Sequence, residues 1–411
     1  MGARYLERAL AKVGQGRRAT PPRCPRCRRV MRSAGVKYKS LRSILGPARF
    51  GRSCFACEPC GYRCFPGDVE LGIENTAFTP GALRMMAKAA SRAPFAEAAE
   101  DLALYANLRV PPKTVERAAE AIGREIQAWM ERQDAALLLQ ARTAQTLPSL
   151  APAPGVLYIE YDGTGVPIRR AELKGRKGKQ EDGSAKTREA KLGCIFTQTT
   201  FDDENRPIRD PCTTTYTGAI ESSEAFGKRL YAEALRRGLY DYQRVVLITD
   251  GAHYNKSIAE LHFPNAVRII DLYHAFQHLH QLAALLLAQS RRKAVEEQWC
   301  ELLERGDIET LTARTTSYLP RSGATRNEAL TQINYFQANA QAMRYQDFRD
   351  RGFFVGSGVI EAGCKSVIGA RLKASGMLWS EQGANAIIAL RCCVCSGRFE
   401  QFWEDRATKT P

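Results

Sequence analysis

The sequence lacks any uninterrupted apolar run of the roughly eighteen residues that a membrane-spanning helix needs. Its beginning also lacks the apolar stretch of a secretory signal, because Arg4, Glu7, Arg8 and Lys12 interrupt it. Internal repeats and low-complexity tracts are missing as well. We therefore expect a soluble cytoplasmic protein without a membrane partner, whose 411 residues suffice for two to four domains.

Acidic residues are scarce relative to basic ones, with 44 Asp and Glu against 60 Lys and Arg. The net charge of +16 predicts attraction to a polyanion, most simply nucleic acid. Residues 17–52 hold twelve Lys and Arg and no acid, and residues 169–191 hold nine against four acids. An isolated run is usually a solvated surface, but two runs beside candidate chemical motifs favour phosphate contacts. The expected contacts are Arg26, Arg28, Arg29 and Arg32 in the first run, and Lys174, Arg176 and Lys177 in the second.

Thirteen cysteines in a large chain without a secretory signal favour metal ligation or burial over disulfides. The first part of the chain contains two Cys-x-x-Cys motifs, Cys24 with Cys27 and Cys57 with Cys60. This arrangement predicts a zinc ribbon, in which each motif supplies two thiolates to one tetrahedral Zn²⁺. Cys54 and Cys64 leave other pairings open, because Cys54 also stands three residues before Cys57 and Cys64 four residues after Cys60.

A helical pattern extends from residue 80 to about residue 140. Within it, residues 95–106 and 113–122 predict two helices separated by a Pro-Pro break. Helix, turn, helix is the outline of a DNA-reading motif, although any pair of packed helices has the same outline. The Pro- and Ala-rich residues 144–155 predict a linker.

Strand-like and helix-like patterns alternate after the linker. Residues 244–250 form a continuous apolar run, which is typical of a strand buried on both faces. A turn over 202–207 between two strand-like stretches predicts a hairpin. The expected strands are 156–162, 191–201, 208–217, 244–250 and 266–271, with a helix over 222–237. This order of strand, hairpin, helix, strand, helix, strand predicts an α/β RNase H-like core.

Residues 274–348 are almost entirely helical in pattern and are too long for a connection, so they predict an all-α insertion. A Gly-Ser-Gly turn at 356–358 is expected to open a final helix that carries Glu361. Residues 385–391 predict a closing core helix.

Two of the expected strands end in a carboxylate followed by glycine, at Asp162 and Asp250. Carboxylates at strand ends lie where open α/β sheets bind ligands, and Mg²⁺ prefers carboxylate oxygens. An Asp before Gly is more often a turn residue, but two in one sheet favour a catalytic site. We therefore expect a pair of Mg²⁺ or Mn²⁺ ions for phosphoryl transfer, with Glu361 as one candidate for a third ligand.

Several strings resemble the ISKra family of insertion-sequence transposases over most of the chain. They are residues 161–167 (YDGTGVP), 186–194 (KTREAKLGC), 271–274 (DLYH), 356–361 (GSGVIE) and 371–377 (RLKASGM), together with the paired cysteines. The resemblance implies a DDE core in which Asp162, Asp250 and Glu361 bind the metal ions, and it makes Glu361 the preferred third ligand. The chain departs from the family pattern at residues 253–255, where a tryptophan is expected nearby.

Further residues are expected to act beside this triad. Asp271 and His274 resemble a short Asp/Cys-x-x-His element of related transposases and are candidate accessory residues, with helix capping as the equal alternative. Lys365, four residues after Glu361, is expected on the same helix face and near substrate phosphate. Arg371 and Lys373 would extend that phosphate contact.

The predicted organisation has six parts. They are a zinc-ribbon-like DNA-binding region over 1–70, a helical, helix-turn-helix-like region over 71–143, a linker over 144–155, the first part of the core over 156–273, the all-α insertion over 274–350, and the last part of the core over 351–411.

The sequence thus predicts a nucleoid-associated bacterial transposase that binds duplex DNA at the element's terminal repeats and at the target, as a homo-oligomer. One alternative is a metal-dependent nuclease of the same fold that cuts without joining. The other is a non-enzymatic zinc-ribbon DNA-binding regulator, against which the acid-terminated strands argue.

Overall fold

The computed structural model describes residues 2–14, 21–143, 153–178, 180 and 183–408. Most of the predicted linker, residues 144–152, lies outside the described residues, and so do residues 15–20 with the start of the first basic run. The chain divides into two compact units: Met1–Trp129 with Asn385–Pro411, and Met130–Ala384. The unit boundaries fall inside two helices, α5 (Pro112–Thr143) and α15 (Glu381–Cys395).

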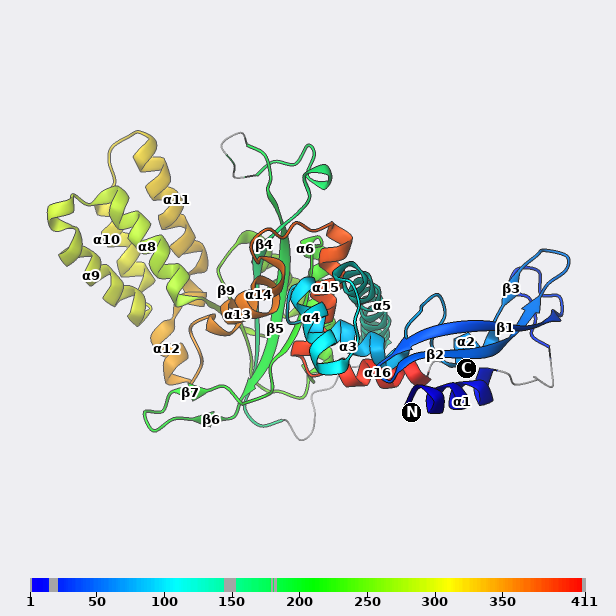
Figure 1. Cartoon of the computed structure of the whole chain (residues 1–411). Helices are drawn as coiled ribbons and strands as arrows, with labels where there is room; N and C mark the ends of the chain where they lie inside the picture. The colour runs from blue at the N-terminus through cyan, green and yellow to red at the C-terminus, as the bar shows by residue number, and fades with distance from the viewer. Residues whose placement is uncertain (1, 15–20, 144–152, 179, 181–182, 409–411) are drawn as a thin grey trace. The chain divides into compact units, whose positions relative to one another are not determined.

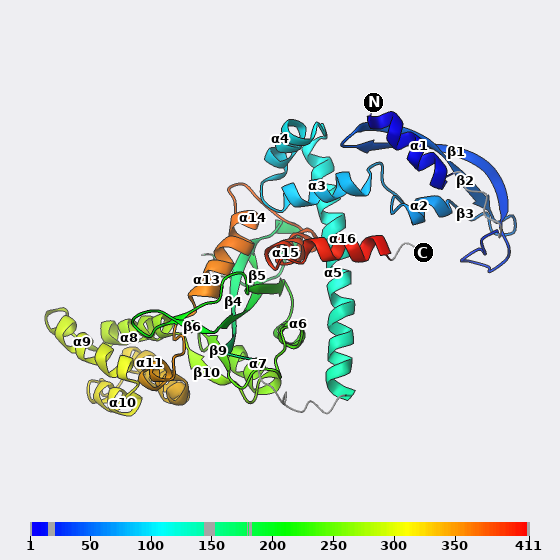
Figure 2. The same cartoon turned by 90° about the horizontal axis from the view of Figure 1, so that it is seen from below.

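A long antiparallel hairpin forms the N-terminal part of the first unit (Figure 1). Apolar residues at alternate positions give the hairpin one buried face, where Leu41, Ala48 and Phe50 pack against Leu10 of the first helix. That helix lies along the hairpin (Figure 2). The elements are α1 (Gly2–Gly14), β1 (Arg32–Ser43), β2 (Gly46–Ala56), β3 (Arg63–Cys64) and α2 (Pro66–Glu70).

Helices α3 (Pro80–Ala90), α4 (Phe95–Ala106) and α16 (Phe399–Thr408), with α5 as far as Trp129 and α15 from Asn385, complete the first unit. Helix α4 has the predicted bounds and ends at Asn107, whose left-handed conformation stops the helix. The second predicted helix, over 113–122, is much longer: α5 continues to Thr143, because no Gly-Pro or Pro signal interrupts its sequence.

A five-stranded mixed sheet is the centre of the second unit, in the order β10-β9-β4-β5-β8 among the described residues. Strand β4 pairs antiparallel with β5 and parallel with β9, while β5 pairs antiparallel with β8 and β9 parallel with β10. The strands are β4 (Val156–Pro167), β5 (Thr187–Gln198), β8 (Thr215–Ala219), β9 (Val245–Thr249) and β10 (Val267–Ile270); the short β6 (Thr200–Phe201) and β7 (Pro207–Ile208) extend the predicted hairpin.

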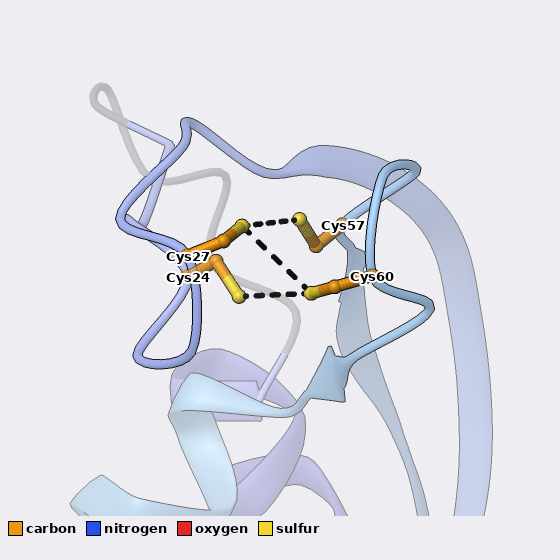
Figure 3. Close-up of side chains that lie close together, drawn as sticks. All are labelled: Cys24, Cys27, Cys57 and Cys60. Carbon is orange, nitrogen blue, oxygen red and sulfur yellow. Dashed lines mark hydrogen bonds between the residues drawn. The ribbon is translucent and has the colours of Figure 1, made fainter.

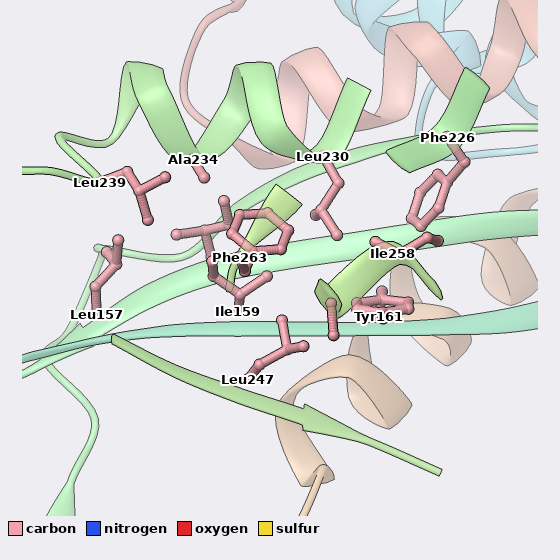
Figure 4. Packing of buried hydrophobic residues seen from close by; sticks show 12 residues of the cluster. Leu157, Ile159, Tyr161, Phe226, Leu230, Ala234, Leu239, Leu247, Ile258 and Phe263 are labelled. Atoms are coloured by element: carbon pink, nitrogen blue, oxygen red, sulfur yellow. The ribbon is translucent and has the colours of Figure 1, made fainter. Parts of the chain in front are cut away.

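The two faces of β4 carry different side chains, because successive side chains of a strand point to opposite sides of the sheet. Leu157, Ile159 and Tyr161 face α6 (Ser223–Arg236) and α7 (His253–His262) in an apolar cluster (Figure 4). The alternate residues, from Tyr158 through Asp162, belong to the other face. Helix α13 (Gly358–Gly363) packs on β4 and β5.

The prediction that the first strand ends at Asp162 was wrong. Strand β4 continues to Pro167, because β5 supplies backbone partners along its whole length. The glycines after Asp162 permit close approach rather than a break: a Cβ at Gly163 would lie 2.4 Å from Glu189 and one at Gly165 would lie 2.9 Å from Thr187. Pairing with β9, however, stops at Glu160, so Asp162 lies just beyond the end of the parallel part of the sheet.

The predicted insertion is helical in the structure. It contains α8 (Leu272–Leu286), α9 (Gln289–Arg305), α10 (Ile308–Ser317), α11 (Ala324–Asn339), the 3₁₀ helix Ala340–Met343 and α12 (Tyr345–Asp350). The predicted single helix after the Gly-Ser-Gly turn is α13 followed by a π-helical segment, Cys364–Gly369, and α14 (Ala370–Leu372). None of the helices in the described part of the chain combines the length and apolar character that crossing a bilayer requires.

Candidate active site and metal centre

Four cysteine side chains converge beside the hairpin of the first unit (Figure 3). The sulfur atoms of Cys24, Cys27, Cys57 and Cys60 all lie within 4.8 Å of one another. Individual distances are 3.5 Å for Cys24 to Cys60, 3.4 Å for Cys27 to Cys57 and 3.8 Å for Cys27 to Cys60. Four sulfurs about 2.3 Å from a central Zn²⁺ lie about 3.8 Å apart, so this group could hold one zinc ion.

The two cysteine loops have the same backbone geometry. The N–H of Arg28 donates to the carbonyl of Cys24, and the N–H of Gly61 to that of Cys57, both at 2.8 Å. Both donors have positive φ, 58° at Arg28 and 69° at Gly61, which glycine adopts without strain. Burial raises the pKa of the Cys24 thiol, but the N–H groups of Cys27 and Arg26 and the neighbouring thiols hold it at about 7. The pKa of the Cys57 thiol shifts the other way, to about 12, because burial and the neighbouring thiols of Cys27 and Cys60 raise it. The four thiols therefore share their protons unequally, and a metal ion would be needed to hold all four as thiolates.

The other two cysteines of this region do not join the group. Cys54 is buried on β2. The sulfur of Cys64 lies 3.7 Å from that of Met31 and packs beside the cluster. Of the ligand sets that the sequence left open, the structure brings together Cys24, Cys27, Cys57 and Cys60.

Asp162 lies on β4, and Asp250 directly follows β9, the strand that pairs with β4. Burial raises the pKa of Asp162, and the charge of Asp250 raises it further. The N–H of Gly163 donates to Oδ1 at 2.6 Å and lowers the pKa, but the net shift is upward. Two carboxylates that repel each other in a partly buried site are suited to a divalent cation, which would relieve the repulsion.

Asn255 holds Asp250 in place and was not anticipated from the sequence. Its side-chain amide and the N–H of Ala252 both donate to Oδ1 of Asp250. Asn255 is almost fully buried, and its main-chain carbonyl accepts a hydrogen bond of 2.7 Å from the hydroxyl of Tyr161. The only sequence signal was an asparagine in the first turn of the helix that follows the aspartate.

Glu361 lies beside Asp271 and His274, which were predicted as accessory residues, and not in one ligand group with Asp162 and Asp250. One ligand atom from each of these three residues falls within 4.8 Å of the others, whereas Asp162, Asp250 and Glu361 form no such group among the described residues. The hydrogen bond to Asp271 raises the pKa of His274, burial opposes the rise, and the charges of Asp271, Asp250 and Asp162 add to it.

Both side-chain oxygens of Asp271 accept hydrogen bonds. Its Oδ1 accepts from the N–H of His274 at 2.7 Å and lies 3.1 Å from the Nδ1 of the same residue. Its Oδ2 accepts from the N–H of Ser357. Burial raises the pKa of Asp271, but these hydrogen bonds outweigh burial and the pKa is lowered. Of the two functions left open for this element, the structure shows capping: Asp271 caps α8, and the same Oδ1 also lies beside the ring of His274. A role in site chemistry stays a prediction.

Glu160 carries a buried carboxyl group and was not predicted from the sequence as a site residue. It lies two residues before Asp162 on the same face of β4 and has no exposed surface. Burial raises its pKa to about 8, against a hydrogen bond from the N–H of Ile360, and the charges of Asp271 and Glu361 contribute to the rise. An acidic residue inside an apolar strand was the available signal, because charged side chains are rarely buried without a partner.

Most of the predicted phosphate contacts lie on the surface. Arg26, Arg28, Arg29, Arg32, Lys174, Arg176, Lys177, Lys365 and Lys373 are exposed. Arg371 differs: it is 1% exposed, its guanidinium lies over the ring of Trp379, and Nη1 lies 3.6 Å from the sulfur of Met377. A phosphate contact at Arg371 does not fit this packing, because the side chain has no surface to offer. Lys373 donates a hydrogen bond to Thr164, two residues beyond Asp162.

Comparison with known proteins adds little to this geometry. No protein-family model matches the chain, and no curated protein matches it either. Among solved structures, the chain is similar to the Drosophila P element transposase strand transfer complex, with 10% sequence identity and a TM-score of 0.25 over 82% of this chain and 83% of that chain. A similarity at this level carries no argument, so the functional conclusion depends on the residues.

Proposed function

We propose that the chain is a DDE-type DNA transposase of the ISKra family with an RNase H-like core. On this proposal it binds the terminal repeats of an insertion sequence as a homo-oligomer, cleaves a DNA strand and joins the 3′-hydroxyl to target DNA. The hairpin with its cysteine site, and α4 with α5, would bind DNA, and the second unit would perform the chemistry.

The observation that carries the proposal is the placement of two aspartates where the parallel pairing of β4 with β9 ends: Asp162 lies two residues beyond the last paired residue of β4, and Asp250 directly follows β9. Glu361 lies beside His274, whose pKa is raised chiefly by Asp271 and further by the charges of Asp250 and Asp162. The strand order, three antiparallel strands followed by two parallel ones across β4, supports the RNase H-like assignment. Two carboxylates at strand positions and one on a helix that packs on the sheet are the residue types that a two-metal site would use.

Two divalent cations bound here would activate the attacking oxygen and stabilise the leaving oxygen of a phosphodiester. Asp162 and Asp250 would share one cation, because their charges repel each other without it. Glu361 would complete the ligand set from the helix side. Asn255 would keep one oxygen of Asp250 hydrogen-bonded, so that the other points to the cation. Lys373, beside Thr164, would contact substrate phosphate.

Joining distinguishes a transposase from a nuclease of the same fold. A labelled element end incubated with a supercoiled plasmid and Mg²⁺ should be both cleaved and covalently joined to the plasmid. The element end itself is obtained by sequencing the DNA on both sides of the gene and identifying inverted repeats. Cleavage without any joined product would favour the nuclease, and end binding without cleavage would favour the regulator.

DNA binding should depend steeply on salt, because the exposed arginines around the cysteine site each displace counterions from a phosphate. Replacing Arg26, Arg28, Arg29 and Arg32 with Gln should flatten the slope of log K against log salt by up to about 3.6, or about 0.9 for each phosphate that is no longer neutralised. The slope is measured by fluorescence anisotropy with the element end.

The matched control removes four exposed charges from the helical insertion, with Arg291, Lys293, Arg305 and Arg321 replaced by Gln. Its slope should stay close to that of the wild type. If the four arginines near the cysteines can be neutralised without a change in slope, they form only a solvated surface.

A further inference from the structure

Helix α13, which carries Glu361, lacks a local cap at its N-terminus. The first N–H groups of a helix have no acceptor within the helix and are usually satisfied by a side chain at the capping position. Ser357 occupies that position, but its side chain makes no capping hydrogen bond. Ser357 and Ile360 are nonetheless buried, at 4% and 1% exposure, so water cannot satisfy their N–H groups either.

Two carboxylates from the sheet take the place of the missing cap. Glu160 on β4 accepts a hydrogen bond of 2.8 Å from the N–H of Ile360, the third residue of the helix. Asp271, at the end of β10, accepts from the N–H of Ser357. In a capping box these two bonds come from side chains of the helix itself. Here they come from strands on either side of β9, so the same bonds attach α13 to the sheet.

The segment before α13 is attached to residues that neighbour Glu160 and Asp271. The hydroxyl of Tyr158, on the same face of β4 as Glu160, accepts a hydrogen bond of 3.2 Å from the N–H of Phe354. The N–H of Leu272, next to Asp271, donates to the carbonyl of Val355 at 3.0 Å. Alternate residues of β4 therefore bind successive parts of residues 354–360, and the next alternate residue is Asp162.

Glu160 has no other evident role. Burying the carboxyl group of Glu160 costs free energy, because without exposed surface the group loses its hydration. Its Oε1 has no hydrogen-bond partner among the described residues. Its Oε2 accepts from the N–H of Ile360 at 2.8 Å and, at the longer distance of 4.0 Å, from the thiol of Cys194, so the bond to Ile360 supplies most of the compensation. Glu361 follows Ile360 directly, so displacement of this turn would move the glutamate relative to Asp162 and Asp250.

We propose that Glu160 is a positioning residue which, with Asp271, fixes the first turn of α13 on the sheet and so presents Glu361 to the cation site. The inference rests on the proposed function for the role of Glu361, but the attachment itself is a property of the fold. Glu160 acts through its acceptor oxygen and not as a metal ligand. Glutamine at this position preserves that oxygen, whereas methionine has nearly the same shape without it.

Two measurements on the full-length protein test the proposal. Hydrogen exchange followed by mass spectrometry reports the protection of the amides of residues 354–363, and electron paramagnetic resonance reports the affinity for Mn²⁺ alone. In Glu160→Met, exchange at Ile360 should accelerate about ten- to hundredfold, as expected when a buried donor loses its acceptor, and Mn²⁺ affinity should fall by about tenfold or more. Glu160→Gln should stay within about threefold of the wild type in both.

Asp162→Asn is the reference variant, because it should lower Mn²⁺ affinity without changing exchange at Ile360. Wild-type exchange and affinity in Glu160→Met would overturn the proposal. An equal loss in Glu160→Gln and Glu160→Met would also overturn it, because the acceptor oxygen would then not be the relevant group. If the wild-type protein neither cleaves nor joins DNA, the proposed function fails, while the exchange data still decide whether Glu160 holds the helix.

Discussion

Replacing Asp162 with Asn, Asp250 with Asn or Glu361 with Gln should reduce strand cleavage and joining by at least about a thousandfold, which corresponds to about 4 kcal/mol. Each substitution preserves the shape of the side chain and removes a charge that a hard divalent cation requires. Because the three carboxylates act as one unit, the triple variant should be little worse than any single one. Binding to the element end, measured by gel shift, should survive, since no part of the first unit is altered.

Glu381→Gln serves as the matched control. Glu381 is the next acidic residue after Glu361 in the sequence, but in the structure it forms an ion pair with Arg188 and belongs to neither candidate ligand group. It should retain cleavage close to the wild-type rate with both Mg²⁺ and Mn²⁺. If Glu361→Gln remained active, the third ligand would have to be sought at Glu381 or at Glu328, which is exposed on α11. Activity in Asp162→Asn or Asp250→Asn would refute the DDE assignment itself.

Substitution of Cys24 and Cys27 with Ser should eliminate bound zinc and unfold the region around the hairpin's open end. Purified wild-type protein should contain about one zinc per chain, and the double variant close to none. The buried cluster at this end consists of Met31, Phe55 and two of the ligand cysteines, Cys24 and Cys57, so little apolar surface remains without the ion. Structural zinc contributes about 10–16 kcal/mol of binding free energy in comparable small sites, far more than such a cluster can replace.

Cys54→Ala with Cys64→Ser is the control pair, drawn from the same region but outside the four-sulfur group. This variant should keep its zinc, although loss of the buried Cys54 sulfur should lower stability slightly. Elemental analysis gives the zinc content, and limited proteolysis reports the folding of the hairpin. Full zinc content in the Cys24 and Cys27 variant, or loss of zinc in the control, would assign the ligands differently.

Several elements were predictable because their signals are local. The bounds of α4 follow from its apolar periodicity and from Asn107, and α6 begins where Ser222 caps it. The strand over 244–250 was predicted within a residue at each end, because a continuous apolar run between polar flanks has few alternatives. The spacing of the two Cys-x-x-Cys motifs likewise restricts which sulfurs can meet.

Elements that depend on a distant partner were less predictable. Strand β4 continues past Asp162 because β5 pairs with it, and nothing in the local sequence distinguishes a glycine that breaks a strand from one that permits close approach. The burial of Arg371 against Trp379 could not be foreseen from a run of basic residues. The assignment of three catalytic acids stays a prediction, which the variants above address, and the predicted domain boundaries also stay a prediction.

By itself, the sequence determined the residue types of both sites: four soft sulfur ligands in one region, and carboxylates after apolar runs in another. Those properties are local, since they follow from the ligand preferences of metals and from the periodicity of strands. Only the tertiary structure decided which groups approach one another. It brought Glu361 beside Asp271 and His274, and it placed Glu160 and Asp271 where they accept hydrogen bonds from the N–H groups of Ile360 and Ser357. Such contacts join residues up to 200 positions apart, and they form because a buried N–H must find an acceptor wherever the fold provides one.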